Sequence, residues 1–251
     1  MLNKITVLEY KDIAIVEFSP GHRHNPFSGE RMDALFDTLV ALENNENIKV
    51  IILYGGKNNS FSVGGDFNEV SNFTGGEEVE KWLDSVNNLY AKVLQLSKPV
   101  IATIDNYAIG FGFQLALMCD YRIGSTNSQF KMPEFAMGIA CNFGGYILDK
   151  FVNRSFMQRM LFDCEAINAI EAKNLDILHD VVDSEILLDF SIKKAEKFAL
   201  YNPIPIKETK KSLNEEVIKG LDQICSKAKN AHKKSFATGV ARTNMLNIIK
   251  A

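Results

Sequence analysis

The stretch KPVIATIDNYAIGFGFQLALMCD, residues 98–120, carries the pattern from which the fold is best deduced. Its PVIATI segment is short, rich in β-branched residues and bounded by turn residues, so it predicts a buried strand. The AIGFGFQLALM segment that follows has two glycines and a nearly unbroken apolar run, which predicts the start of a buried helix. Gln114 is the one amide in that run. We therefore expect it at the floor of a site.

Two similar strand patterns precede this stretch, IAIVEF at residues 13–18 and IKVIILY at residues 48–54. Between successive strands, apolar residues recur at helical spacing. They are Met32, Leu35, Phe36, Leu39 and Leu42 in the first interval, and Val79, Trp82, Leu83, Val86, Leu89, Tyr90, Val93 and Leu94 in the second. Alternating strands and helices imply parallel strands with crossover helices, so the predicted fold class is α/β.

The C-terminal third is predominantly helical in pattern. Helices are predicted over residues 184–200, 206–219 and 221 to about 236. The YNPIP segment, residues 201–205, separates the first from the second because proline interrupts a helix. We expect a core domain over residues 1–195, followed by a helical region over residues 196–251.

The charge balance limits the classes of partner. The 251-residue chain has a formal net charge of −3 at pH 7. Nucleic-acid and membrane-surface partners are disfavoured, because both require an excess of Lys and Arg. The N-terminus lacks the apolar core of a signal peptide, and no apolar stretch is long enough to span a membrane. These features predict a cytoplasmic protein.

The motifs for common cofactors and metals are incomplete. GFGFQL begins like a dinucleotide fingerprint but lacks its third glycine, and no Gly-Lys-Ser/Thr motif occurs. His22 and His24 leave only two further histidines to complete a metal site. The dispersed cysteines indicate neither a disulfide framework nor a zinc site; they are Cys119, Cys141, Cys164 and Cys225. We expect no metal and no permanently bound cofactor.

Three glycine-bearing segments follow predicted strands: SFSVGGD at residues 60–66, YAIGFGF at 107–113 and MPEFAMGIACNFGG at 132–145. They should lie at the carboxyl ends of strands, where open α/β sheets bind ligands. Backbone N–H groups from the first two segments can converge on one carbonyl oxygen, with the helix dipole adding to the stabilisation of negative charge. This arrangement is an oxyanion hole. The alternative is that the glycines serve only tight turns and close contacts.

Together, SFSVGGDFNEV and KPVIATIDNYAIGFGFQLALMCDYRIGSTNSQFKMPEFAMGIACNFGG resemble the enoyl-CoA hydratase/isomerase, or crotonase, superfamily. The resemblance covers nearly the whole chain. It implies a spiral of ββα units and a C-terminal helical region used in trimerisation. It also implies that a coenzyme A thioester is the substrate, with its carbonyl bound by the N–H groups of Gly65 and Phe111. Gly64 and Asp66 are then expected beside that substrate.

The resemblance also identifies a departure at the catalytic carboxylates. Hydratases of the superfamily carry two glutamates, and the position of the second is Glu134 in this chain, whereas the first is replaced by Gln114. Water addition requires one proton to be removed from water and another to be delivered to carbon, which suits a pair of carboxyls. An amide cannot titrate. Ordinary hydratase activity is therefore disfavoured.

Further stretches are similar to the carboxymethylproline synthase branch of the superfamily: HNPFS at residues 24–28, the pair Trp82 and Tyr90, and the pair Gly138 and Cys141. That branch serves carbapenem-type biosynthesis. The resemblance implies that malonyl-CoA loses CO2 to give an enolate, which attacks the cyclic imine amino acid pyrroline-5-carboxylate. Thioester hydrolysis then releases carboxymethylproline. An amide at Gln114 suits the malonyl carboxylate, which a glutamate would repel.

The roles of several residues stay open at this point. Glu134 is expected to stabilise the iminium or to orient the hydrolytic water, with a helix-start carboxylate as the alternative. Gln114 has a structural alternative, an amide that ties two loops together. The resemblance puts Trp82 and His232 near the substrate, with core packing the alternative for Trp82 and a solvated basic face for His232. Arg23, His24 and Asn25 are expected to bind coenzyme A.

Three other functions are compatible with the sequence. Two are enzymes, an enoyl-CoA hydratase/isomerase and another malonyl-thioester decarboxylase. The third is a catalytically silent module that binds acyl-CoA or RNA, although the net charge disfavours RNA. The resemblance further implies a homotrimer or a dimer of trimers.

Overall fold

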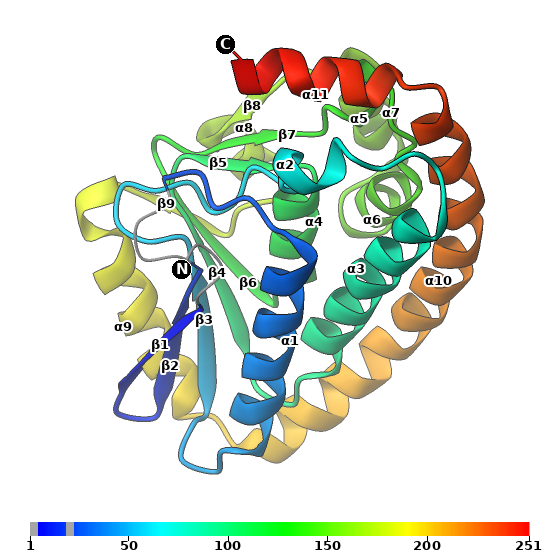
Figure 1. Ribbon diagram of the computed structural model, residues 1–251. Helices are drawn as coiled ribbons and strands as arrows, with labels where there is room; N and C mark the ends of the chain where they lie inside the picture. The colour runs from blue at the N-terminus through cyan, green and yellow to red at the C-terminus, as the bar shows by residue number, and fades with distance from the viewer. Residues whose placement is uncertain (1–4, 19–22, 251) are drawn as a thin grey trace.

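The computed structural model describes residues 5–18 and 23–250, and its framework is a six-stranded sheet (Figure 1). The strand order is β1-β2-β3-β4-β6-β9, and only the first pair, β1 with β2, is antiparallel. The strands are β1 Thr6–Tyr10, β2 Ile13–Glu17, β3 Val50–Tyr54, β4 Val100–Ile104, β6 Tyr121–Ser125 and β9 Asp180–Val182. This confirms the predicted parallel α/β arrangement and the three strands expected from the sequence.

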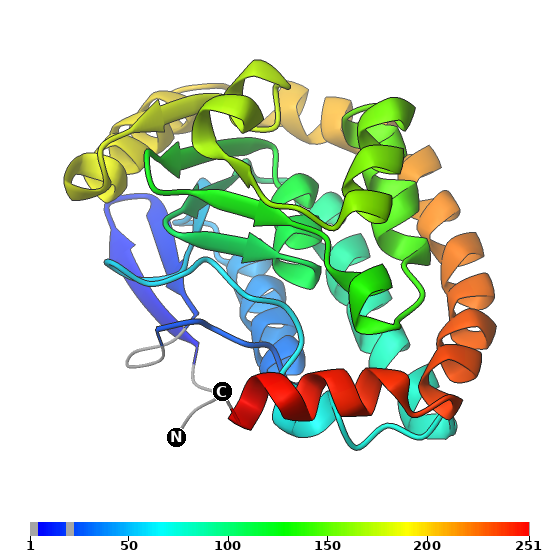
Figure 2. The ribbon, with the colours of Figure 1, turned by 90° about the horizontal axis from the view of Figure 1, so that it is seen from above.

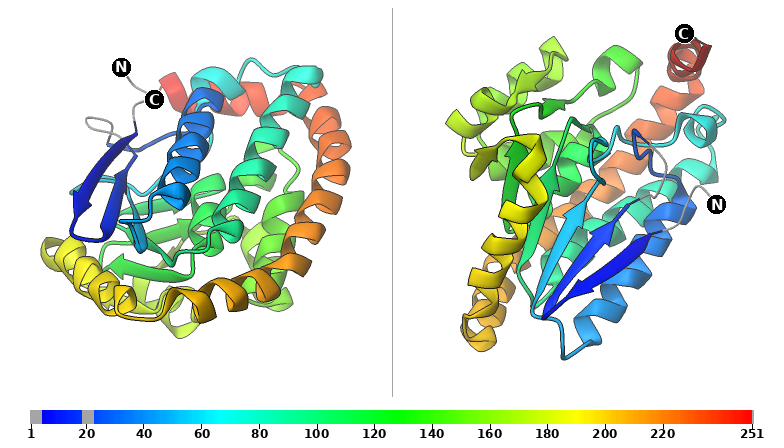
Figure 3. Two further views of the ribbon diagram at one scale, coloured as in Figure 1. Left: turned by 90° about the horizontal axis from the view of Figure 1, so that it is seen from below. Right: turned by 90° about the vertical axis from the view of Figure 1, so that its left-hand side faces the viewer.

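Helices cover both faces of the large sheet. Side chains alternate between the faces of a strand, so Ile51 and Leu53 join one hydrophobic core while Val50 and Ile52 join another. The first core is closed by α1 (Gly29–Asn44), α3 (Glu77–Gln95) and α4 (Phe111–Met118). The second is closed by α9 (Leu187–Ala199), which follows the short helix η1 (Ser184–Ile186) and lies on the opposite side in Figure 3. Burial on both faces explains why these strands are apolar throughout.

A second, three-stranded sheet supports the glycine segments. Its order is β5-β7-β8, formed by Tyr107–Ile109, Gln129–Lys131 and Ile167–Asn168 (Figure 2). The chain passes from β4 to β5 to α4, and from β6 to β7 to α5 (Glu134–Met137) and α6 (Asn142–Phe151). Each passage takes one strand from each sheet and then a helix. The expected spiral of ββα units is therefore confirmed.

The C-terminal helices differ from the prediction in one respect. Residues 206–219 and 221–236, expected as two helices, lie in the single 35-residue helix α10, Pro203–Ala237. Gly220 is at the join, and a Cβ atom there would lie 1.9 Å from the hydroxyl oxygen of Tyr146. Glycine thus makes room for a neighbouring helix and does not end its own. The break at YNPIP is confirmed, because Asn202 caps α10 and Pro203 is its first residue.

The long helix α10 runs beside α3 and α6, and α11 (Val240–Lys250) turns back across the end of the molecule (Figures 1 and 2). The other helices are α2 Phe67–Val70, α7 Arg154–Asp163 and α8 Ala169–Asn174. The division expected after residue 195 falls within α9 and stays a prediction. Among the described helices, none is long and apolar enough to cross a membrane.

Candidate active site

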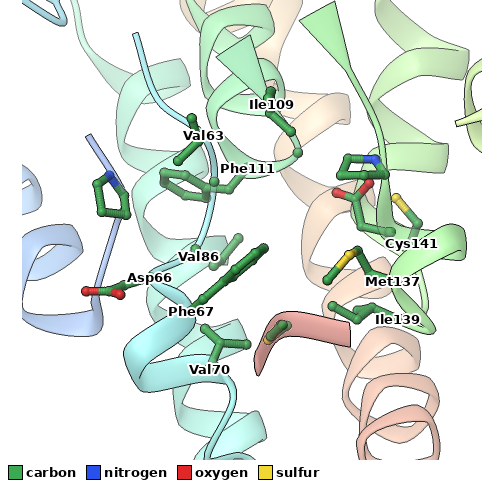
Figure 4. Close-up of a pocket in the computed structure, with 18 of the residues that line it drawn as sticks. Val63, Asp66, Phe67, Val70, Val86, Ile109, Phe111, Met137, Ile139 and Cys141 are labelled. Atoms are coloured by element: carbon green, nitrogen blue, oxygen red, sulfur yellow. The ribbon is translucent and has the colours of Figure 1, made fainter. Parts of the chain in front are cut away.

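The three glycine segments meet around one cavity of about 830 Å³ (Figure 4). Its wall is mostly apolar, with contributions from α2, α3, α4, α5, α10 and α11. The apolar lining includes Val63, Phe67, Val70, Val86, Ile109, Phe111, Met137 and Ile139. A large apolar cavity with few polar groups is the usual form of a small-molecule site.

Gly65 turns its backbone N–H away from Phe27, its partner in a parallel bridge. The flanking groups pair with Phe27: the Phe27 N–H donates to the Gly64 carbonyl at 2.8 Å, and the Asp66 N–H donates to the Phe27 carbonyl at 2.8 Å. In such a parallel bridge the N–H of the middle residue points to the opposite side. Gly65 lines the cavity, so its N–H is available to a bound ligand.

The second N–H belongs to Phe111, the first residue of α4. The first N–H groups of a helix have no acceptor within that helix. Hydrogen bonds from Ser62 N–H to the Tyr107 carbonyl, 3.1 Å, and from Ile109 N–H to the Ser62 carbonyl, 2.9 Å, tie this helix start to the Gly65 segment. Gly64 has φ +98°, and a Cβ atom there would lie 3.2 Å from the Ile109 carbonyl oxygen. The two N–H groups therefore belong to neighbouring segments of the cavity wall, and the oxyanion hole that they would form stays a prediction.

Gln114 lies deeper, within hydrogen-bonding distance of two polar side chains. The Tyr90 hydroxyl donates to Gln114 Oε1 at 3.0 Å, and Gln114 Nε2 donates to Glu134 Oε1 at 3.3 Å. All three residues line the cavity. Gln114 thus faces Glu134, as the sequence-based interpretation required of a modified catalytic pair.

Glu134 is a strongly perturbed carboxyl. Burial raises its pKa to about 7, against smaller opposing effects from hydrogen bonds with its own backbone and with the Cys141 thiol. Its Oε2 atom is buried and has no hydrogen-bond partner among the described residues. Gly110, at φ +52°, leaves room for the Glu134 carboxyl, because a Cβ atom on Gly110 would lie 3.0 Å from Glu134 Oε1. A carboxyl that titrates near neutral pH is suited to proton transfer.

Trp82 and His232 both reach the cavity wall. A Cβ atom on Gly65 would lie 3.3 Å from Trp82 Cζ2, so the indole is beside the proposed oxyanion hole. His232 is buried, and its Nδ1 donates to the Ala228 carbonyl at 3.0 Å. Burial lowers the pKa of His232 to about 4, so the ring is neutral at pH 7 and presents Nε2 as an acceptor. The alternative of a solvated basic face for His232 is wrong.

Of the three residues expected to bind coenzyme A, His24 is the one that lines the cavity. Asn25 is buried, and its amide donates to the carbonyls of Gly55 and Ser60 at 2.6 and 2.8 Å, so it holds the loops in place away from the cavity. His24 lines the cavity, whereas the exposed Arg23 does not. The Asp66 carboxylate caps α2 and points away from Phe111 in Figure 4. His22 lies outside the described residues.

Sequence reasoning missed the contribution of the last helix. Met245, Ile248 and Ile249 from α11 line the cavity, and Lys131 from β7 supplies a cation to it. An apolar stripe on a short terminal helix indicates only that this side of the helix is buried. It does not indicate on which part of the molecule the helix packs. No local signal placed α11 opposite segments more than 100 residues away. Among the described residues, no group of three or more His, Cys, Asp or Glu is arranged to hold a metal ion.

Comparisons with known proteins agree with this geometry. The enoyl-CoA hydratase/isomerase family profile matches residues 9–246. Carboxymethylproline synthase from Pectobacterium carotovorum subsp. carotovorum is 35% identical over 95% of this chain and 95% of its own. Short-chain-enoyl-CoA hydratase from Clostridium acetobutylicum is 26% identical, covering 94% and 91% of the two chains.

Solved structures extend the comparison. ThnE from S. clavuligerus is 39% identical with a TM-score of 0.81, covering 91% of this chain and 100% of its own. Enoyl-CoA hydratase from Bacillus halodurans shares the fold at a TM-score of 0.87 and 20% identity, covering 97% of this chain and 99% of its own. The match thus extends over nearly the whole chain. The chain belongs to the enoyl-CoA hydratase/isomerase family, whose fold and acyl-CoA chemistry it shares.

Proposed function

We propose that this enzyme decarboxylates malonyl-CoA and condenses the resulting enolate with pyrroline-5-carboxylate to give carboxymethylproline. The observation that carries the proposal is the Gln114 amide, whose Nε2 lies 3.3 Å from Glu134 Oε1 where a hydratase would place a second carboxylate. One relative supports it by name, the 35% identical protein called carboxymethylproline synthase.

In the first step, the bond between the malonyl carboxylate carbon and C2 breaks, and CO2 leaves. The electron pair moves into the thioester and forms an enolate. The N–H groups of Gly65 and Phe111 would donate to the enolate oxygen, where negative charge develops. The second N–H of Gln114 Nε2 would hold the carboxylate before it leaves. The apolar wall excludes water, which favours loss of a charged carboxylate as neutral CO2.

In the second step, the enolate carbon attacks the imine carbon of the electrophile in its protonated, iminium form, and the nitrogen takes the electron pair and becomes a secondary amine. We propose that Glu134, ionised above a pH of about 7, stabilises the iminium or orients the water that later cleaves the thioester. His232 Nε2 would accept a hydrogen bond from the N–H of the iminium, and Trp82 would bound the electrophile beside Gly65. Thioester hydrolysis then releases coenzyme A and carboxymethylproline.

The proposal is tested by mass-resolved turnover of malonyl-CoA with and without pyrroline-5-carboxylate, with crotonyl-CoA as the control substrate. Loss of CO2 together with imine-dependent formation of carboxymethylproline supports the proposal. CO2 loss without any condensation product indicates a simple malonyl-thioester decarboxylase. Hydration of crotonyl-CoA indicates a hydratase, and tight thioester binding without thiol release indicates a silent binding module.

Glu134→Gln tests the carboxyl separately. We expect product formation to fall by at least about 100-fold, the usual range for loss of a group that handles a proton, while Kd for acetyl-CoA changes little. In the unmutated enzyme, kcat/KM for condensation should decline below a pH of about 7, because Glu134 becomes protonated there. Glu165→Gln, on an exposed residue, is the matched control. Retained activity in Glu134→Gln would assign Glu134 a structural role.

We also propose a homotrimer, or a dimer of trimers, assembled through the helical region of residues 196–251. The basis is the family membership. Light scattering coupled to size-exclusion chromatography tests it, and a monomer at micromolar concentration would contradict it.

A further inference from the structure

Tyr90 lines the cavity, and the proposed mechanism gives it no role. It is on α3, its side chain is fully buried, and its hydroxyl donates to Gln114 Oε1 at 3.0 Å. Burial raises the pKa of the phenol well above its usual value, so the hydroxyl stays a donor throughout the neutral range. A permanent donor at this place constrains the amide that it contacts.

An amide side chain can lie in two directions that differ by a half-turn. The Tyr90 hydroxyl stabilises the direction in which Oε1 faces α3 and Nε2 faces Glu134, because it donates to Oε1 there, whereas in the reverse direction its oxygen would have to accept from Nε2. In the reverse direction Oε1 would face Glu134 Oε1 at about the same 3.3 Å separation, with two acceptors opposed whenever Glu134 is ionised. The selected direction also places Nε2 beside Gly144, another residue of the cavity wall, where a Cβ atom would lie 3.3 Å from it.

The same tyrosine supports the oxyanion hole. Its ring is stacked on Phe111, with centroids 5.6 Å apart and planes 19° apart, and it meets Phe143 edge-on at 5.8 Å. The Phe111 N–H is one of the two proposed enolate donors. One buried side chain is therefore in contact with both the amide and the helix start that the proposed reaction uses.

We propose that Tyr90 is a positioning residue, which fixes the direction of the Gln114 amide so that both Nε2–H groups are presented to anions, one to Glu134 and one to the substrate carboxylate. This inference rests on the proposed function for its substrate, though not for the amide direction itself. Tyr90 acts through Gln114 and does not touch the reacting atoms.

The kinetic test is a double-mutant cycle between Tyr90→Phe and Gln114→Ala. Tyr90→Phe retains the ring stacked on Phe111 and removes only the donor. We expect kcat for malonyl-CoA decarboxylation to fall on the order of 10-fold, with little change in KM. In the Gln114→Ala background, Tyr90→Phe should have less than about a 2-fold effect, because no amide remains to be directed. Equal effects in both backgrounds would overturn the proposal.

A control variant and a second readout complete the test. Tyr146→Phe removes a hydroxyl that donates to the Val217 carbonyl at 3.3 Å outside the cavity, and kcat should not change. The pKa of Glu134, followed by NMR of its labelled carboxyl carbon, should rise in Tyr90→Phe, because an undirected amide no longer stabilises the anion. An unchanged pKa would contradict the proposal.

The NMR measurement requires no substrate. If the unmutated enzyme does not decarboxylate malonyl-CoA, the proposed function fails, yet the titration of Glu134 still decides whether Tyr90 directs the amide. If decarboxylation occurs and the Tyr90→Phe titration matches that of the unmutated protein, the proposed function stands and the role of Tyr90 fails.

Discussion

Gln114 lies between a phenol that donates to its Oε1 and a carboxyl that is ionised or neutral near pH 7. A glutamate in place of Gln114 would have nearly the same side-chain shape but would lack the Nε2–H donor. It would also put a second carboxyl about 3.3 Å from Glu134 Oε1. Two carboxyls at that separation share one proton, because both cannot ionise without strong repulsion. The amide therefore removes a titrating group from the site and supplies a donor.

Gln114→Glu should consequently lower malonyl-CoA decarboxylation by at least about 10-fold, through repulsion of the malonyl carboxylate. Acetyl-CoA lacks that carboxylate, so its Kd should change little. Steady-state kinetics and calorimetric titration measure the two effects. Gln158→Glu makes the same charge change at an exposed residue of α7 and should alter neither. Unchanged decarboxylation in Gln114→Glu would mean that the malonyl carboxylate does not require an amide at this position.

At the scale of single residues, the resemblance indicated Gly65, Phe111, Gln114 and Glu134, and the structure places all four on the wall of one cavity. Their catalytic roles stay a prediction. It did not identify Asn25 as a buried structural amide, because a short loop motif does not reveal which carbonyls its side chain meets. The positioning role of Tyr90 was also out of reach, since its apolar helical spacing is equally typical of a core residue.

At the scale of elements, predictability followed burial and length. Strands β2, β3 and β4 are five residues long and buried on both faces, so their composition alone marks them. Strands β5 and β8 have only three and two residues, and their pairing depends on tertiary contacts that no local pattern encodes. The continuity of α10 was missed because a glycine in a helical pattern is ambiguous between an end and a close contact.

The Gly220→Ala variant tests whether Gly220 is required for a close contact between helices. Intrinsic propensity alone would make alanine more favourable than glycine by about 1 kcal/mol in a helix interior. The structure predicts the opposite sign, because the new Cβ atom would lie 1.9 Å from the Tyr146 hydroxyl oxygen and 2.5 Å from its Cζ. We expect unfolding free energy to fall by about 1–3 kcal/mol, as in other overpacked sites. Urea denaturation followed by circular dichroism measures it.

Two further variants control that experiment. Ser212→Ala, on an exposed residue of the same helix, gains propensity without a clash and should be neutral or stabilising. In a Tyr146→Leu background the hydroxyl and ring are absent, so Gly220→Ala should no longer be harmful. A stabilised Gly220→Ala protein would instead mean that Tyr146 moves aside at little cost.

At the scale of the whole molecule, buried titratable groups set how stability depends on pH. Burial and the Arg122 guanidinium lower the pKa of His179 to about 4, and burial lowers that of His232 to about 4. Each histidine therefore stabilises the fold fully above its unfolded pKa of about 6.5, and this contribution is lost as pH falls toward 4. Glu134 has the opposite sign, because its raised pKa of about 7 makes the native state bind a proton that the unfolded chain has released.

Between a pH of about 4.5 and 6.5 the two histidines thus oppose one glutamate. The unfolded chain binds about one proton more than the native state, so unfolding free energy should rise with pH by at most about 1.4 kcal/mol per unit. His179 is partly exposed, and solvent screening reduces its share. Glu78 does not change the slope in this pH range. Backbone hydrogen bonds lower its pKa to about 2, so its contribution to the unfolding free energy is lost only below a pH of about 4.5.

Mutation can separate the opposite contributions of the histidines and of Glu134 to the pH dependence of the unfolding free energy. Urea unfolding at pH 5 and pH 6.5 should show a steeper pH dependence in Glu134→Gln, which removes the opposing group, and a flatter one in His232→Gln, which removes a supporting group. Slopes that shift in the same direction in Glu134→Gln and His232→Gln would contradict the assignment, because burial penalises a carboxylate and an imidazolium with opposite consequences for pH.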